Sequence, residues 1–223
     1  MSLQKTPLRK LLQLFYAPAN LRTSKIREDI RKENAKADGK KSGNGGDFHV
    51  PFWSDAKQHA LGAGDLQELV EARIAADSKK SKLYPLLAQG FLAWWDEKRR
   101  WRNEPLAPLG TPSGTQLALP EIAATVKIEG TMALESGPNF HRIIYPYFSE
   151  NPNLPPEGAR LALWAMSEVF LLHKPKDLRV LDVLRGTSAG IDDYPLLGDE
   201  REIFLQRYRF VLSERDRLSV EYL

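Results

Sequence analysis

Alternating apolar and polar positions mark two neighbouring strands in the second half of the chain. Residues 126–129 read Val-Lys-Ile-Glu, which is the two-residue period of a strand with one face in solvent. The alternation continues beyond Gly130, which we interpret as a bulge or a close approach of the backbone. Turn-forming residues at 136–139 precede a second apolar run at 140–145. The two strands are therefore predicted to pair as an antiparallel hairpin.

A long apolar segment and a short apolar run follow the hairpin. Residues 159–172 are apolar at nearly every position, which predicts a helix that is covered on most sides. The segment is shorter than the ~20 residues of a membrane span and contains Arg160, so no membrane span is expected. Residues 180–184 are apolar without alternation, which is typical of a central strand packed on both faces. The intervening length suits a right-handed crossover between parallel strands.

The first hundred residues have the pattern of helices. Residues 8–15 carry leucine and phenylalanine at helical spacing, which predicts one apolar face. Residues 22–36 have helical composition but few apolar positions, so we expect a surface helix or one that meets a polyanion. The clearest stripe runs from residue 82 to residue 101 and predicts an α-helix of five turns.

Proline and glycine are frequent in residues 105–120, which we interpret as a connection between two regions. The first is a helical, basic region at residues 1–104, and the second is a mixed β-β-α-β-α domain at residues 121–223. Asp199 and Glu202 have the spacing that begins the last helix. The predicted fold class is α+β, with a helical N-terminal half followed by a β-hairpin–helix–strand–helix unit around a small mixed sheet.

Composition excludes some chemistry and locates the charge. The 223 residues contain no cysteine, which excludes disulfides, thiolate metal sites and a cysteine nucleophile. No signal peptide is recognisable, so a cytoplasmic location is expected. The net charge is +3, but residues 1–41 hold 11 Lys/Arg against 4 Asp/Glu. An excess of positive charge confined to one segment indicates a partner of opposite charge.

Residues 1–41, which we call the basic arm, supply the first candidate residues. Lysine and arginine bind nucleic-acid phosphates without sequence preference by releasing counterions. The alternative is a solvated helix face, which is the usual role of a charge run. The candidate nucleic-acid contacts of the arm are Arg22, Lys25, Arg27, Arg31 and Lys32.

Aromatic and cationic residues alternate at the end of the long predicted helix. Interleaved rings and cations can stack on bases and hold the phosphate backbone. The helical period places the other tryptophans of this segment in the apolar stripe, which favours a structural role for them. Trp95 falls outside the stripe, and Arg99 and Arg102 follow it, so these three are added as candidate nucleic-acid contacts.

The acidic candidates are Glu129, Glu135 and Asp182. Asp182 interrupts an apolar run, and a buried carboxylate must be paired with a cation or bind a metal ion. The arginines that could make Asp182 structural are Arg142, Arg160 and Arg185.

The order hairpin, helix, strand over residues 123–185 is similar to the core of the PD-(D/E)XK nuclease superfamily, including its RecB-like branch. That family places an acid on the hairpin and an acid-x-lysine on the next strand, which together bind Mg²⁺. Here Lys127-x-Glu129 has these residue types in reverse order, and the return strand at 143–148 has neither. The resemblance is one of topology. It implies either a divergent Mg²⁺-dependent nuclease that uses the three acidic candidates, or a member without catalysis.

The leading hypothesis is a non-enzymatic cytoplasmic accessory protein that contacts nucleic acid, or a nucleic-acid-processing complex, through the basic arm. The alternatives are the divergent nuclease and a protein–protein or homo-oligomeric subunit that binds no nucleic acid. No cofactor or metal is expected, and Mg²⁺ belongs only to the nuclease alternative. The surroundings of Asp182 distinguish these hypotheses, because an arginine beside it indicates a structural role and a second carboxylate indicates a metal site.

Overall fold

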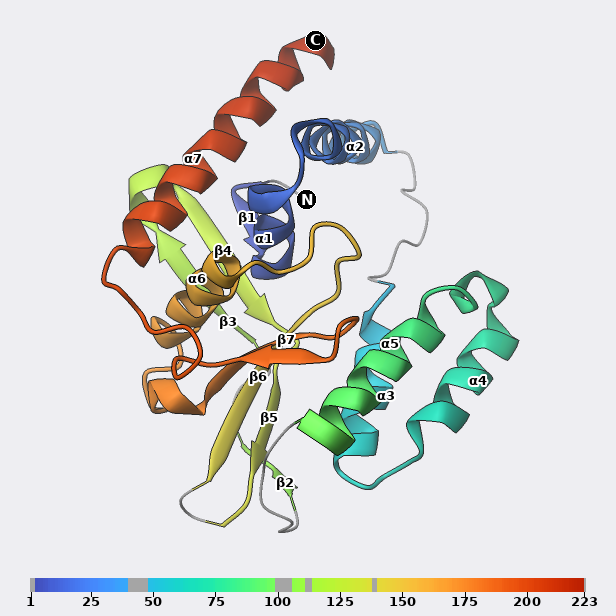
Figure 1. Cartoon of the computed structure of the whole chain (residues 1–223). Coiled ribbons are helices and arrows are strands. Elements are labelled where there is room, and N and C mark those ends of the chain that lie inside the picture. Colours follow the sequence, from blue (N-terminus) through green and yellow to red (C-terminus); the bar gives the residue numbers. More distant parts are fainter. Residues whose placement is uncertain (1–2, 40–47, 99–105, 111–113, 138–139, 223) are drawn as a thin grey trace.

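A five-stranded sheet lies near the centre of the molecule, with helices on both of its faces (Figure 1). The computed structural model describes residues 3–39, 48–98, 106–110, 114–137 and 140–222. The α-helices of these residues are α1 (Leu8–Tyr16), α2 (Ala19–Ala37), α3 (Val50–Ala60), α4 (Leu66–Ala76), α5 (Tyr84–Leu92), α6 (Pro156–Ser167) and α7 (Glu200–Ser219). The strands are β1 (Lys5–Pro7), β2 (Ala107–Pro108), β3 (Gly114–Leu119), β4 (Ala124–Glu129), β5 (Met132–Glu135), β6 (His141–Tyr147), β7 (Leu178–Asp182) and β8 (Thr187–Ala189).

The predicted hairpin–helix–strand–helix unit is confirmed. β5 and β6 pair antiparallel, with Met132 opposite Ile144. β7 lies parallel to β6, with Val180 opposite Tyr145, and α6 makes the crossover between them. The strand order β2-β5-β6-β7-β8 places β7 between two other strands, as its apolar sequence requires. Together with the helices of the first hundred residues, this unit makes the fold α+β.

Gly130 divides what the sequence indicates as one strand into β4 and β5, which belong to different sheets. β4 pairs with β1 and β3 in a three-stranded sheet, whereas β5 pairs with β2 and β6. Gly130 has a φ of +80°, a conformation that glycine adopts without a steric penalty. The alternation of side chains persists on both sides of the turn, but the pairing partner changes. At Gly130 the chain therefore passes from one sheet to the other, instead of forming a bulge within one strand.

Three short strands lie outside the strands that the sequence predicts. β1 pairs parallel with β4 and includes Thr6 and Pro7, directly before the helix predicted at residues 8–15. β3 lies inside the proline- and glycine-rich segment 105–120 and pairs antiparallel with β4. β8 lies between β7 and the last helix and pairs antiparallel with β7. All three are short, and their pairing depends on strands elsewhere in the chain. β1 also shows that backbone pairing joins the first residues to residues 121–223.

Successive side chains of the central strands face opposite helical layers. Ile143, Tyr145 and Val180 belong to the apolar cluster that also includes residues of α1, α6 and α7. Ile144 and Leu181 belong to the second cluster, with residues of α3, α4 and α5. Because β6 and β7 are covered on both faces, they need apolar residues at almost every position.

α6 is the buried helix predicted at residues 159–172, with different ends. It begins at Pro156, whose fixed φ suits the first turn of a helix. It ends at Ser167, and Leu171 and Leu172 are 79% and 97% exposed in the turn that follows. None of the helices in the described parts of the chain combines the length and the apolar content needed to cross a membrane.

The predicted five-turn helix at residues 82–101 begins as α5 and then widens. Residues Ala93–Lys98 form a π-helical segment, in which hydrogen bonds span five residues instead of four. Trp94 and Trp95 are both buried in this segment. Residues 99–101 lie outside the described residues.

Candidate functional site

Asp182 binds an arginine and two backbone amides at the end of β7. Its carboxylate lies 3.0 Å from Nη1 of Arg185 and accepts hydrogen bonds from the backbone N–H groups of Leu154 and Arg185. The side chain is 4% exposed. Burial raises the pKa of this carboxyl, and the charge of Arg185 opposes the increase. The surroundings of Asp182 are those of a structural ion pair.

The other two acidic candidates lie apart from Asp182. Asp182 is opposite Tyr147 at the carboxyl end of β6, whereas Glu135 is opposite His141 at the amino end. At ~3.3 Å per residue, the length of β6 separates these positions by about 20 Å. Glu129 ends β4 in the other sheet and is exposed. Within the described ranges, no three side chains of metal-ligating type gather into a group that could hold an ion.

The cations of α2 make ion pairs within the molecule. Arg22 binds Glu214 of α7 at 2.7 Å, and Arg27 binds Glu221, just beyond the end of α7, at 2.9 Å. Lys32 pairs with a glutamate one turn earlier in α2 at 2.5 Å. α2 lies across α7, which brings these charges together although they are far apart in the sequence (Figure 1). The pairs offset much of the positive charge of the basic arm.

Two further pairs fix α2 in place and leave few of its cations for a partner. Lys10 of α1 binds Asp29 at 2.6 Å, and Arg215 of α7 binds Glu33 at 2.6 Å. Lys25 is half-buried and Arg31 is exposed. For these two residues, the described part of the chain offers no carboxylate at ion-pairing distance. Lys25 and Arg31 are therefore the candidates of α2 whose charge is least compensated.

Trp95 belongs to the apolar core. It is 6% exposed, and its ring stacks on Phe91 with centroids 5.9 Å apart. Its neighbour Trp94 donates a hydrogen bond from Nε1 to the hydroxyl of Ser188 in β8. The expectation that Trp95 lies outside the apolar stripe is thus wrong, because Trp95 follows Phe91 by four residues and packs on its ring. The candidates Arg99 and Arg102 lie outside the described residues.

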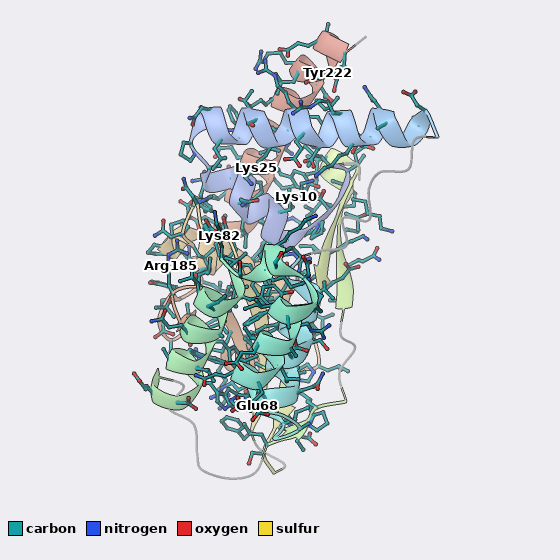
Figure 2. All side chains as sticks on the ribbon, turned by 90° about the vertical axis from the view of Figure 1, so that its right-hand side faces the viewer. Lys10, Lys25, Glu68, Lys82, Arg185 and Tyr222 are labelled. Atoms are coloured by element: carbon teal, nitrogen blue, oxygen red, sulfur yellow. The ribbon has the colours of Figure 1, made fainter. Side chains whose placement is uncertain are left out.

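A cationic hollow opens at the carboxyl end of β6, between α1 and the beginning of α3. It consists of two adjoining cavities of about 160 and 180 Å³, both bordered by Arg9, His49 and Phe148. Lys57 lines the first cavity and Lys10 lines the second. Figure 2 shows Lys10 on α1, between α2 and the layer of α3, α4 and α5. Of the described residues that line the two cavities, none is aspartate or glutamate.

Among the residues that line the hollow, Lys57 gives the strongest indication of an anionic ligand. It stands four residues after Trp53, on the same side of α3, and is half-buried. Burial lowers the pKa of its ammonium group, because the charged form loses contact with water. The described residues place no carboxylate at ion-pairing distance from it. An anion in the hollow would compensate this desolvated charge.

His49 adds a titratable ring to the hollow. The imidazole stacks on Phe148, with centroids 4.7 Å apart and the planes 6° from parallel. Burial, and then the positive charge of Arg9, lower the pKa of His49 to about 4, and the negative charge of Glu150 opposes the decrease. The ring is therefore neutral at neutral pH. A bound anion would favour the protonated ring and raise this pKa.

Asp182 and Arg185 hold the loop that borders the hollow. Arg185 donates from Nη1 to the carbonyl oxygen of Ser149 at 3.0 Å and from Nη2 to that of Glu150 at 2.7 Å. Gln13 of α1 donates to the hydroxyl of Ser149 at 2.9 Å. Asp182, a candidate metal ligand in the sequence analysis, thus positions the loop at Ser149 and Glu150 through Arg185.

Arg9, His49 and Lys57 are not among the residues that the sequence pattern selects. Arg9 lies in α1, whereas His49 precedes α3 and Lys57 lies within it, and the whole of α2 comes between these two helices in the sequence. One signal is visible in the sequence, because Lys57 lies at helical spacing from the aromatic residues that begin α3. Their proximity depends on how the two helices pack at the end of β6.

Comparison with models of protein families finds no match to this chain, and comparison with curated proteins finds none either. The functional argument therefore rests on the geometry and charge of the molecule itself.

Proposed function

We propose that the chain is a non-enzymatic cytoplasmic accessory protein that contacts nucleic acid, alone or within a nucleic-acid-processing complex. In this proposal the cationic hollow receives a phosphate group of the strand. The supporting observation is the half-buried Lys57 beside Arg9 and His49, in a hollow whose described lining carries no carboxylate. Lys25 and Arg31 of α2 add positive charge that attracts a polyanion at longer range.

The size and lining of the hollow favour contact with the sugar–phosphate backbone of a nucleic acid over contact with its bases. Cavities of about 160 and 180 Å³ exceed the volume of a water molecule, about 30 Å³, several times. They can take a phosphate group with part of its sugar. Trp53 and Phe148 are each 4% exposed, so their faces are not available for stacking on bases. Phosphate contacts position a protein on nucleic acid without reading its sequence.

A salt titration with matched variants tests the proposal. Fluorescence anisotropy would measure the affinity of the full chain for labelled single-stranded and duplex DNA and RNA at several salt concentrations. Lys57→Gln is expected to weaken binding to every sequence and to reduce the slope of log K against log salt by about one. Lys25→Gln is the matched control on α2, with a smaller expected effect on affinity. No affinity at low salt, or equal loss in the two variants, contradicts a phosphate contact in the hollow.

Two further experiments distinguish a strand from a free phosphate ester as the ligand, and binding from catalysis. Mononucleotides and inorganic phosphate compete with the labelled strand if the hollow binds a free phosphate ester as well as a strand. Incubation with DNA and Mg²⁺ or Mn²⁺, beside Asp182→Ala, tests catalysis. Cleavage by the wild-type chain that Asp182→Ala abolishes would overturn the non-enzymatic role.

A further inference from the structure

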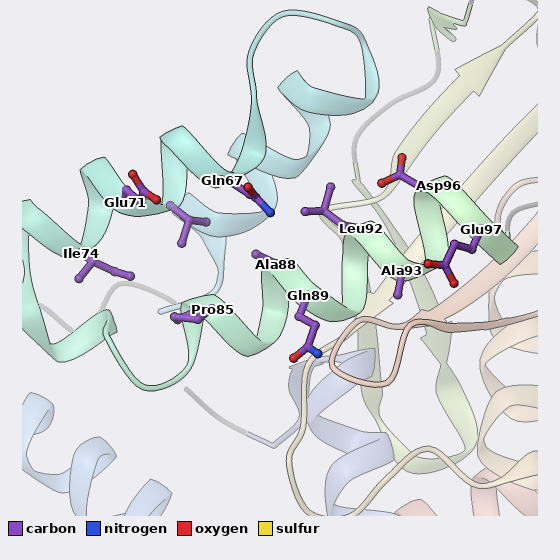
Figure 3. Close-up of a pocket in the computed structure, with 11 residues that line it drawn as sticks. Gln67, Glu71, Ile74, Pro85, Ala88, Gln89, Leu92, Ala93, Asp96 and Glu97 are labelled. Carbon is purple, nitrogen blue, oxygen red and sulfur yellow. The ribbon is translucent and has the colours of Figure 1, made fainter.

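A groove runs along the outer surface between α4 and the continuous α5 and π-helical segment (Figure 3). Its volume is about 720 Å³, which lies within the ~300–1,000 Å³ of typical ligand pockets. The floor is mostly apolar, with Gln67 and Gln89 also lining the groove. Figure 3 shows Ala88 and Leu92 on the side of α5 that faces α4. The apolar residues that line it are Val70, Ile74, Pro85, Ala88, Leu92 and Ala93.

Carboxylates lie on both sides of this apolar floor. Glu71 projects from α4, and Asp96 and Glu97 project from the π-helical segment (Figure 3). All three residues are exposed. None of the described lining residues is lysine or arginine. We call this surface the acidic groove.

The π-helical segment supplies two of the three carboxylates of the groove. Trp94 and Trp95 are buried against Phe91, and the next two residues, Asp96 and Glu97, are exposed. Asp96 and Glu97 thus lie on the exposed side of this segment, whereas the two tryptophans lie on its buried side. π-Helical turns inside α-helices are frequent at functional sites.

We propose that the acidic groove binds an amphipathic helix of a partner protein, with apolar residues on one face and lysine or arginine beside them. An apolar floor between two helices accepts a third helix through side chains at positions i, i+3, i+4 and i+7. The carboxylates of Glu71, Asp96 and Glu97 select a basic helix and repel an acidic one. The interaction is separate from the cationic hollow, whose lining has the opposite charge. It also gives the protein-partner alternative a defined surface.

Helical peptides of about 18 residues, long enough to form helix in solution, provide the probe. The basic peptide carries leucines at i, i+3, i+4 and i+7 with flanking lysines and arginines. One control replaces these cations by glutamate, and a second keeps the composition but breaks the leucine spacing. Titration of the full chain is expected to show binding of the basic peptide alone, with an affinity that decreases as salt increases. Equal binding of the acidic peptide, or no binding by any peptide at low salt, overturns the proposal.

Charge reversal locates the binding site. Glu71→Lys combined with Glu97→Lys is expected to reduce the affinity for the basic peptide at least tenfold, because attraction between opposite charges is replaced by repulsion. Both residues are exposed, so the fold should persist. Glu202→Lys, an exposed acid of α7, is the matched control and should leave the affinity within twofold of the wild type. Circular dichroism of each variant verifies the fold. Equal binding by the reversed and control variants places the peptide elsewhere and refutes the groove as its site.

A last variant tests whether the chain fills its own groove. Residues 99, 100 and 102 are arginines that follow the π-helical segment in the sequence. If the basic peptide binds only after these three are changed to glutamine, the occupant is this chain and the partner proposal is wrong. Lys57→Gln should leave peptide binding unchanged, so failure of the hollow and failure of the groove can be distinguished.

Discussion

Gly90 of α5 faces Gly186 in the turn after β7, and the two backbones are in direct contact. A β-carbon on Gly186 would lie 2.4 Å from the carbonyl oxygen of Gly90. A β-carbon on Gly90 would lie 2.1 Å from the carbonyl oxygen of Val183. The layer of α3, α4 and α5 can approach the central sheet this closely because neither position carries a side chain.

Gly90→Ala is therefore predicted to destabilise the protein by about 3 kcal/mol, at the upper end of overpacking costs, because its new neighbours are backbone atoms that cannot rotate away. The midpoint of urea denaturation measures the effect. Gly110→Ala is the control, since a β-carbon at Gly110 would meet no atom within 4 Å and the φ of this residue is not positive. A control change within about 0.5 kcal/mol is expected. Equal midpoints for Gly90→Ala and the wild type would contradict the close contact.

The ion pair between Asp55 of α3 and Arg73 of α4 should respond unequally to the loss of either partner. The guanidinium donates two hydrogen bonds of 2.9 Å to the carboxylate. The side chain of Asp55 is 1% exposed, whereas that of Arg73 is 43% exposed. Arg73→Ala leaves a buried carboxylate without its cation and is expected to cost about 3–5 kcal/mol. Asp55→Ala leaves a guanidinium that water can reach and should cost about 1–3 kcal/mol.

Chemical denaturation of the two single variants and the double variant measures this asymmetry. The double variant should be more stable than Arg73→Ala alone, because it no longer contains the unpaired buried charge. A larger loss in Asp55→Ala than in Arg73→Ala would contradict the role assigned to burial.

Asp182→Ala removes the acceptor of two backbone N–H groups and the partner of Arg185. A loss of about 1–3 kcal/mol in the free energy of unfolding is expected. Asp216→Ala is the matched control, because that carboxylate is 77% exposed on α7 and should contribute little. Loss of stability in both variants by the same amount would contradict the structural role of Asp182.

The raised pKa of Asp182 also gives a pH dependence with a definite sign. In the pH range between its ordinary value and the raised value, the folded state binds more protons at this carboxyl than the unfolded state. This contribution to stability therefore decreases as pH rises through that range. Asp182→Ala lacks the contribution, so the difference in stability between wild type and variant should narrow as pH rises there. Denaturation midpoints at several pH values measure it, and a widening difference would contradict the assignment.

The neutral imidazole of His49 predicts how binding in the cationic hollow depends on pH. Its pKa is about 4 in the free protein, and a bound phosphodiester should raise it. Linkage then requires that the affinity for the phosphodiester increase as pH falls toward the pKa of the complex. A phosphodiester is the suitable probe because its own charge is constant in this range. Anisotropy titrations should show the increase for the wild type and a smaller one for His49→Gln. Identical profiles would place the anion away from His49.

The sequence alone determined the elements whose signal is local. The apolar run of β7, the buried character of α6 and the hairpin of β5 and β6 all follow from side-chain periodicity, because a covered element needs apolar residues on each covered face. The α+β class follows from the order of these elements along the chain.

Only the tertiary structure decided the pairing of distant segments. β1 and β8 are three residues long and exist because β4 and β7 supply hydrogen bonds that no local pattern encodes. Arg22 and Arg27 read as free cations in the sequence, yet α7 places Glu214 and Glu221 beside them. Charge is a property of the residue, but its availability to a partner depends on which residues fold against it.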